Sequence, residues 1–394
     1  MDFNMAYGFC VLIVVLFLLL PDGIMHFNTW QARIKIGRYS TVDSWENKVL
    51  KRTLKWLKHT PTIKLTDNSR LIIIDIIKGN YKRDAIQYWQ EAALVLGLLP
   101  YANHKSECNT KSSITAFFDS KIDASGNWKS APKEIDAAIL AYAFLSIEWI
   151  DPNKNKPAYD TIWVLIQDLL GEDGTVKYRK SMPDYRYVDT IGFICPFLVK
   201  YGLQFNNENA VDLAINQITA FNQYGMYPDK FIPCHTYHLK SKHAVGLFGW
   251  GRGLGWYAIG LIDAWLALPN NHSQKKILTK CVVDFSQMAA QFQNPDGSWN
   301  WIVSSKEARP DSSTTATLLW YFTNAASIES ISENSKSVCN KAIHYLMKVT
   351  RRNGSIDFSQ GDTKGIGVHS QEFDILPFTQ GFALRSVFRL TKGL

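Results

Sequence analysis

Low-complexity tracts, collagen-type repeats and long runs of one charge are all missing from this sequence of 394 residues, which excludes fibrous and largely disordered chains. Cysteine is also scarce, since there are six and no two of them have CxxC spacing. We therefore expect neither a disulfide framework nor a zinc ribbon. Cys195 and Cys234 are expected to serve as small core residues.

Positive charge is in excess, but it is not concentrated. The net charge is +8 at pH 7, and the Lys and Arg residues are spread along the chain. A basic surface favours anionic partners, and without a basic arm we expect an acidic glycan and no nucleic acid. Hydrophobic residues make up 46% and aromatic residues 13% of the chain, enough for a large core with aromatic side chains left for a pocket.

One long hydrophobic run is present, from Met5 to Leu20, and it contains no charge. Neither a basic n-region nor an A-x-A cleavage pattern accompanies it, as a secretory signal would require. We predict an uncleaved membrane segment over residues 1–23, with a buried core helix as the alternative. The positive-inside rule then predicts a cytoplasmic body, because basic residues follow the run and none precedes it. They are Arg33, Lys35 and Arg38.

The rest of the chain, residues 40–394, is predicted to be one domain of helices and turns. Apolar residues recur at helical spacing in several segments, while strand-like alternation is scarce. The segments are 49–57, 92–99, 137–147, 191–199, 258–268, 281–292, 315–322 and 382–390. The run Leu71–Ile77 fits a buried strand or a buried helix equally well.

Short glycine turns followed by an apolar residue recur at intervals of roughly 50–60 residues, each between two helical segments. They lie at Gly126, Gly174, Gly225, Gly297 and Gly354. With the hairpin before the first turn, they predict six helical hairpins. Six hairpins that close on themselves form an all-α fold, the (α/α)6 barrel. The alternative is an open solenoid, whose repeats are usually shorter and more regular.

A polar residue follows each glycine turn, so the repeat predicts a funnel at one end of the ring. These residues are Asp136, Asp189, Arg252, Asp311 and Asp374. Carboxylates exchange protons and aromatic faces stack on rings, so such a funnel suits a sugar. A structural role is the alternative for three of these residues. Asp189 and Asp311 could each cap a helix, and we favour this role for Asp311. Asp136 could be an acidic residue in the first turn of a helix, where it complements the helix dipole.

The segment Gly249-Trp-Gly-Arg-Gly-Leu-Gly-Trp256 alternates glycines with larger residues. We expect its backbone to pass close to a ligand, with Arg252 binding an oxyanion and Trp256 stacking on a ring. Its dinucleotide-like spacing lacks a preceding strand, so no nucleotide cofactor is expected. No metal is expected either, because the nearby histidines lack a carboxylate at ligand spacing. They are His235, His238 and His243.

Taken in order, these motifs resemble the unsaturated glucuronyl and rhamnogalacturonyl hydrolases of glycoside hydrolase families 88 and 105. The resemblance covers residues 45–392, and the Trp-Gly-Arg-Gly-x-Gly-Trp block is its most specific part. The motifs are Asp136, Tyr187-Val-Asp-Thr…Pro-Phe-Leu, His235, the block from Trp250 to Trp256, Asp296-Gly-Ser-Trp and Asp311-Ser-Ser. The family fold is an (α/α)6 barrel, in agreement with the repeat.

The resemblance implies that water adds across the 4,5 double bond of a terminal unsaturated uronic acid, after which a hemiketal opens and releases the aglycone sugar. It implies that Asp189 is the general acid and base and that Asp136 assists it, each carboxylate raising the pKa of the other. It implies no metal or organic cofactor. The substrate contacts that it implies are Tyr187, His235, Trp250, Arg252 and Trp256.

The chain departs from the family at Leu254, where Asn or Gln is usual, and at Tyr187, where Trp is frequent. The first departure predicts that one polar sugar contact is missing. Two other functions stay open. One is an (α/α)6 hydrolase that attacks a saturated glycan with paired carboxylates. The other is a membrane-tethered protein that binds glycan without turning it over.

Overall fold

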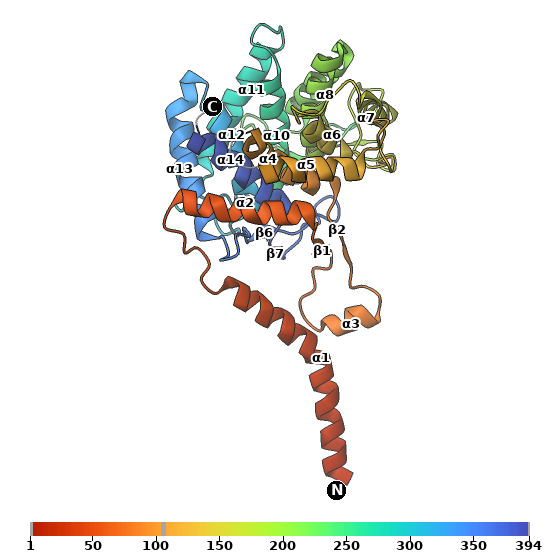
Figure 1. Cartoon of the computed structure of the whole chain (residues 1–394), viewed down its shortest axis with the longest axis vertical. Coiled ribbons are helices and arrows are strands. Elements are labelled where there is room, and N and C mark those ends of the chain that lie inside the picture. Colours follow the sequence, from red (N-terminus) through yellow and green to blue (C-terminus); the bar gives the residue numbers. More distant parts are fainter. Residues whose placement is uncertain (1–2, 104–107, 393–394) are drawn as a thin grey trace.

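The computed structural model of the chain describes residues 3–103 and 108–392. Six helices form an inner ring in which each contacts the next and the last contacts the first. They are α4 (Tyr88–Asn103), α6 (Ala137–Leu145), α8 (Val188–Phe205), α10 (Gly251–Ala267), α12 (Ser312–Ala325) and α14 (Pro377–Lys392). The outer helices alternate with them along the chain: α2 (Val42–Lys58), α5 (Cys108–Lys121), α7 (Lys156–Asp168), α9 (Glu208–Tyr224), α11 (Lys275–Gln291) and α13 (Ser332–Lys348), the last preceded by a short 3₁₀ turn, η1 (Glu329–Ile331). The predicted (α/α)6 barrel is confirmed (Figure 1).

Inner and outer helices differ in sequence because they are covered on different sides. The inner helices α6 and α12 bury every one of their residues. An outer helix such as α13 buries one face, with Val338, Ala342 and Leu346, and keeps polar residues outside. The predicted segments therefore fall in the inner helices and in α2 and α11, while α5, α7, α9 and α13 carry too few apolar residues to form such runs.

The glycine turns follow one plan at four of the five predicted positions. At Gly126, Gly174, Gly297 and Gly354 the backbone has a φ between +71° and +92°, which an L side chain rarely adopts. An antiparallel bridge closes the turns at Gly126, Gly174 and Gly354, and a backbone hydrogen bond from Asn294 N to the Ser298 carbonyl closes the turn at Gly297. Gly225 differs, because its φ is −103° and it ends α9 as an ordinary C-cap before a longer loop. The prediction of an equivalent turn at Gly225 is wrong.

Short antiparallel strands form within the loops at one end of the barrel. The antiparallel sheet β3-β4-β5 consists of β3 (Tyr185–Tyr187), β4 (Cys234–His238) and β5 (Ala244–Phe248). Its register sets Tyr187 opposite Thr236. A separate pair, β6 (Ser359–Gln360) and β7 (Phe373–Asp374), brackets the last loop before α14. Cys195 and Cys234 are both buried, as the sequence predicts.

The ring closes where α4 meets α14. A side chain at Gly381 would collide with the Ala93 carbonyl, and one at Gly97 would collide with the Gly381 carbonyl. The two helices therefore approach more closely than side chains would allow. A buried ion pair joins the other side of α14 to α10, with 2.7 Å between Arg385 Nη1 and Asp263 Oδ2.

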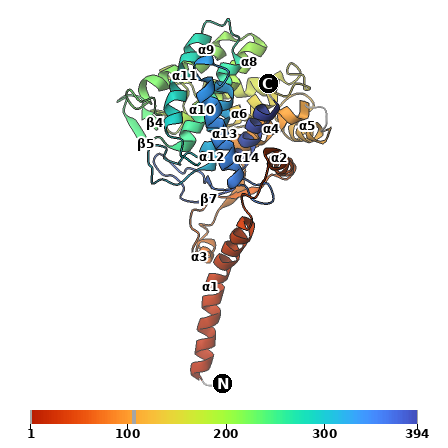
Figure 2. The same ribbon diagram turned by 90° about the vertical axis from the view of Figure 1, so that its left-hand side faces the viewer.

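The N-terminal helix α1 (Phe3–Arg33) stands apart from the barrel (Figure 2). Among the described residues it is the one helix long and apolar enough to cross a membrane, and no residue of its most apolar window is buried. The prediction of a buried core helix, held as an alternative, is thereby excluded. Helical structure continues through Pro21 and past the predicted segment 1–23 to Arg33, and Figure 1 shows that α1 changes direction beside α3. A proline lacks the N–H that an unbroken helix needs, and a bend accommodates it.

Residues 62–85 leave the barrel as an excursion between α2 and α4. Its stem is the antiparallel pair β1 (Thr62–Lys64) and β2 (Arg83–Ala85). Its tip is a short helix, α3 (Ile72–Ile77), which lies against α1. The run Leu71–Ile77 is thus helical, but the expectation that it is buried is wrong, because Ile77 is 71% exposed.

Candidate active site

One pocket, of about 280 Å³, gathers most of the residues singled out from the sequence. It is lined by Asp189, Tyr187, His235, Trp250, Arg252 and Trp256, together with Gln87, Trp89, Tyr178, Arg179, Phe193 and residues 362–365. A larger groove of about 600 Å³ between α9 and α11 contains none of the predicted residues. The smaller pocket is therefore the candidate active site.

Asp189 lies in the first turn of α8, directly after β3. The N-cap position belongs to Tyr187, and no side chain caps this helix, so the interpretation of Asp189 as a cap is wrong. Its Oδ2 atom is buried and has no hydrogen-bond partner among the described residues. Burial is the main cause that raises the pKa of Asp189 to about 7. The carboxyl group can therefore hold or release a proton near neutral pH.

His235 comes from β4, and its Nε2 lies 3.7 Å from Asp189 Oδ2. Burial, with His369 nearby, lowers the pKa of His235 to about 3. The imidazole is therefore neutral at pH 7, and the contact is not an ion pair despite the short distance. The ring packs between Trp250, at 4.6 Å between centroids, and Tyr187, at 5.4 Å.

Arg252 lies in the first turn of α10 and is 2% exposed. Its Nη2 donates to the carbonyl oxygens of Gln360, at 2.8 Å, and Gly361. Its Nε and Nη1 atoms have no partner, and no carboxylate of the described ranges lies within ion-pair distance of it. A buried guanidinium with free donors facing a pocket is suited to bind an anionic group of a ligand.

The glycines around Arg252 serve packing. A side chain at Gly251 or Gly255 would collide with Thr314 or Thr317 of α12. These residues open α10, and the glycines let it pack closely on α12 while Trp250, Arg252 and Trp256 line the pocket. Leu254 is fully buried and does not line the pocket, so its apolar nature removes no pocket contact.

Asp136 lies behind the wall of the pocket. It occupies the N-cap position of α6 without a side-chain cap bond and is 9% exposed. Burial is the main cause that raises the pKa of Asp136 to about 7, and a hydrogen bond from the Trp89 backbone lowers the pKa by less than burial raises it. Both carboxyls thus have raised pKa values, but burial, rather than the mutual repulsion that we expected, is the principal reason. Asp136 and Asp189 both raise the pKa of Tyr178, which is a pocket residue.

Two residues of the predicted funnel lie elsewhere. Asp311 is the N-cap of α12 and accepts hydrogen bonds from the Ser313 and Thr314 backbone and hydroxyl groups. Its Oδ1 also accepts from Gln360 N, at 2.9 Å, so it supports the strand that holds Arg252. Asp374 lies on β7, where its 62%-exposed side chain pairs with Arg351. The repeat therefore brings only part of the predicted funnel together.

Sequence reasoning missed the remaining pocket residues. Trp89 lies in the first turn of α4, and its ring contacts Trp256 at 5.6 Å between centroids. Arg179 and Lys364 bring positive charge to the opening. The signals were present as a Gln-Tyr-Trp sequence before an apolar helix and as the charged, glycine-rich stretch 361–365.

Several buried polar atoms without partners belong to residues that line this pocket. These residues are Asp189, His235, Arg252 and Thr363. In residues 3–103 and 108–392 no group of three or more His, Cys, Asp or Glu side chains is arranged to hold a metal ion. The arrangement offers a proton donor and acceptor, a fixed cation and an aromatic wall, which is the equipment for acid–base chemistry on an anionic ring.

Comparison with known proteins agrees with this geometry. The family model for Glycosyl Hydrolase Family 88 matches residues 56–384. A solved structure of a possible GH105 member from Salmonella enterica serovar Paratyphi A is 15% identical with a TM-score of 0.75, covering 90% of this chain and 96% of its own. An unsaturated glucuronyl hydrolase from Bacillus sp. GL1, responsible for the degradation of glycosaminoglycan, is 15% identical with a TM-score of 0.64, covering 89% and 96%. No curated protein matches the chain.

Proposed function

The chain belongs to glycoside hydrolase family 88 and is a glycoside hydrolase, and from that premise we propose that it hydrates the 4,5 double bond of a terminal unsaturated uronic acid. The observation that supports this most is that Asp189 and Arg252 line the same pocket. Asp189 has a pKa near 7 and an unpartnered oxygen. Arg252 is a buried cation whose free donors match a uronate carboxylate.

The first step is the transfer of a proton from Asp189 to the double bond. With the uronate carboxylate held by Arg252, protonated Asp189 donates its proton to C4 of the double bond. Positive charge then develops at C5 and on the ring oxygen. Asp189, now a carboxylate, takes a proton from water while the water oxygen bonds to C5. One proton and one hydroxyl have been added, and the acid is restored to its starting state.

The product of this addition breaks down without further help from the enzyme. C5 carries both a hydroxyl group and the ring oxygen, so it is a hemiketal. Cleavage of its bond to the ring oxygen leaves a ketone at C5 and a hemiacetal at C1. The hemiacetal then expels the aglycone as an alcohol, so the glycosidic bond is broken although no residue attacks C1.

The remaining pocket residues would position the sugar. Trp89, Trp250 and Trp256 offer rings of the kind on which sugars stack. His235, neutral at pH 7, would exchange a hydrogen bond with a hydroxyl group rather than carry charge. We assign Asp136 a supporting role through Trp89 and Tyr178, since it lies behind the pocket wall. The positive charge of Arg179 at the pocket favours an acidic oligosaccharide.

The reaction predicts a loss of ultraviolet absorbance, because hydration destroys the conjugated double bond. We expect the purified chain to remove the absorbance of at least one unsaturated uronyl oligosaccharide from a panel made with several polysaccharide lyases. The matched control is the same oligosaccharide with a saturated terminal uronate. Release of sugar from the saturated compound alone would favour direct displacement by paired carboxylates. Binding without turnover of either would favour a glycan-binding protein.

The pH dependence follows from the protonation state of Asp189. Since the donor must be protonated, we expect kcat/KM to fall as pH rises through an apparent pKa of about 7. His235 should add no acidic limb above pH 4, because its pKa is about 3. Asp136 also has a pKa of about 7, so the matched control is the residual activity of Asp136→Asn. An alkaline limb that disappears in this variant would contradict the assignment to Asp189.

We also propose that α1 anchors the barrel to a membrane by a single span, with the barrel on the cytoplasmic side. The support is the length, apolarity and exposure of α1 and the basic residues that follow its apolar part. Recovery of the whole protein, with its N-terminus intact, in the soluble fraction would contradict this anchor.

A further inference from the structure

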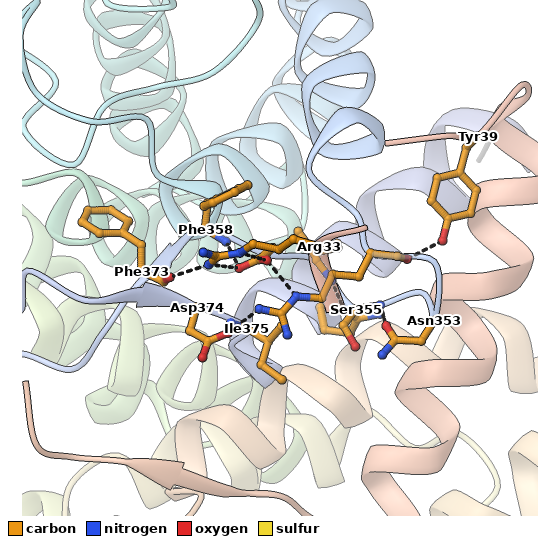
Figure 3. Close-up of polar contacts among 12 residues, drawn as sticks. Arg33, Tyr39, Asn353, Ser355, Phe358, Phe373, Asp374 and Ile375 are labelled. Atoms are coloured by element: carbon orange, nitrogen blue, oxygen red, sulfur yellow. Dashed lines mark hydrogen bonds and ion pairs between the residues drawn. The ribbon is translucent and has the colours of Figure 1, made fainter. Parts of the chain in front are cut away.

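The base of α1 is fastened to the barrel. Arg33 Nε and Nη2 lie 2.8 and 3.1 Å from the two carboxylate oxygens of Asp357, and Nη2 also donates to the Phe373 carbonyl (Figure 3). Burial alone would raise the pKa of Asp357, but Arg33 and Arg351 lower it below its ordinary value. The Arg33 guanidinium also lies 4.6 Å above the Phe358 ring. The direction in which α1 leaves the barrel is therefore set by defined contacts.

The excursion 62–85 reaches α1 at its first acidic residue after the apolar run. Asp22 accepts hydrogen bonds from the backbone N–H groups of Leu71 and Ile72, the latter at 3.0 Å. The apolar run before it, Met5–Leu20, rises about 24 Å as a helix, while a bilayer's hydrocarbon core is about 30 Å thick. If α1 spans a bilayer, Asp22 therefore lies at or within the edge of the hydrocarbon, and α3 lies at the same depth.

The side chains of α3 are unsuited to water at this position. Leu71, Ile76 and Ile77 are 41%, 48% and 71% exposed, although the excursion has no core of its own to explain them. On α1, the helix that α3 contacts, Ile24 and Phe27 are 52% and 57% exposed. Apolar groups from two segments far apart in sequence thus lie on neighbouring elements, away from the barrel (Figures 1 and 2).

Basic residues flank this apolar tip. They are Arg70, Lys78 and Lys82, all exposed, while the one acidic residue of α3, Asp75, accepts a hydrogen bond from Asn68 at 2.6 Å. An apolar surface bordered by lysine and arginine is typical of segments that lie in the interface of a bilayer, where the chains meet lipid tails and the charges meet phosphate groups. Continuity with α1 selects lipid over a protein partner, because α3 contacts α1 directly after the apolar run that is proposed to enter the membrane.

We propose that α3 inserts into the lipid surface beside α1, so that the protein contacts the membrane at two places. This inference rests on the membrane anchor proposed above. Its consequence reaches the pocket, since Asp67 in the same excursion accepts a hydrogen bond from Ser370 and lies 2.9 Å from Lys364 Nζ. Lys364 lines the pocket. The element that enters the lipid therefore also holds the loop at the pocket's opening.

The test uses the full chain in phosphatidylcholine–phosphatidylglycerol vesicles, with an environment-sensitive fluorophore on single cysteines. These are introduced as Ile77→Cys in α3, Phe17→Cys in α1 and Val164→Cys on α7, after replacement of Cys10 and Cys108 by serine. The four cysteines that remain are buried, so the introduced thiol is the accessible one. All three target side chains are strongly exposed, at 71%, 60% and 57%. Val164 is the matched control, because it is an exposed apolar residue on the barrel wall.

We expect nitroxide-labelled lipid to quench the fluorescence of the probes at Ile77 and Phe17 but not that of the probe at Val164. Iodide dissolved in the water should quench the probe at Val164 and leave the other two unquenched. A probe at Ile77 that behaves like the one at Val164, while the probe at Phe17 is quenched by lipid, overturns the inference and leaves the anchor standing. An Ile77 probe shielded from both quenchers also overturns it, in favour of a protein partner. Failure of lipid to quench the Phe17 probe overturns the anchor itself.

Discussion

Asp189→Asn is expected to lower kcat on an unsaturated uronyl oligosaccharide by roughly 10³–10⁴-fold, near the upper end of what one positioned acid–base group contributes. The amide keeps the shape of the carboxyl but can neither donate a proton to C4 nor accept one from water. Since Asp189 does not hold the uronate carboxylate in our proposal, KM should change little. Both quantities come from absorbance progress curves measured against substrate concentration.

The stability of this variant provides the control. Burial raises the pKa of Asp189, so the charged carboxylate destabilises the folded state increasingly as pH rises from the unfolded pKa towards about 7. Asp189→Asn removes this ionisation, so its Tm at pH 8 should equal or exceed that of the wild type. An inactive variant with a much lower Tm would point to misfolding. A variant that keeps wild-type kcat would reject Asp189 as the acid and base.

Arg252→Gln is expected to lower kcat/KM by roughly 10²-fold, because a hydrogen bond to a charged group contributes about 1.5–3 kcal/mol and each 1.4 kcal/mol is a factor of ten. The free Nε and Nη1 donors of Arg252 are the ones assigned to the uronate carboxylate. The matched control is Arg179→Gln, which removes the same charge at an exposed position on the same pocket and should cost far less.

A substrate whose uronate is methyl-esterified separates binding of the carboxylate from a structural role of Arg252. Arg252 also donates to the carbonyls of Gln360 and Gly361, so its loss could disturb the loop that carries them. If carboxylate binding is its role, the wild type should lose activity on the ester and Arg252→Gln should lose little more. An equal defect of the variant on acid and ester would instead assign Arg252 to the loop.

The sequence revealed the architecture because the physical signals for it are local. A helix covered on both sides contains a continuous apolar run and no exposed charged face, and a tight turn at positive φ needs glycine, as at Gly126 and Gly297. Both patterns are visible without knowing what packs against what. The outer helices α7 and α9 were not predicted because only one face of each is buried, so polar residues interrupt their apolar residues along the sequence.

The site was harder to predict because its members come from segments that only the closed ring brings together. Asp189, His235 and Arg252 were found through their motifs, and they do line one pocket. Asp311 has the same position after a turn as Asp189, yet it caps its helix with backbone hydrogen bonds. Sequence position alone does not distinguish a carboxylate that satisfies its own helix from one whose oxygen stays free. Lys364 was missed because a loop between two-residue strands has no periodicity.

The contact of Gly97 with Gly381 has a consequence for how the chain is made. Translation at about 5–20 residues per second takes about 20–80 s for a chain of this length, and it delivers α14 last. Until then the surface of α4 around Ala93, which α14 covers in the finished ring, has no partner. The ring of the nascent chain therefore stays open, with the apolar surface of α4 exposed, until α14 leaves the ribosome. A stop codon before Pro377 would remove α14 and prevent the ring from closing.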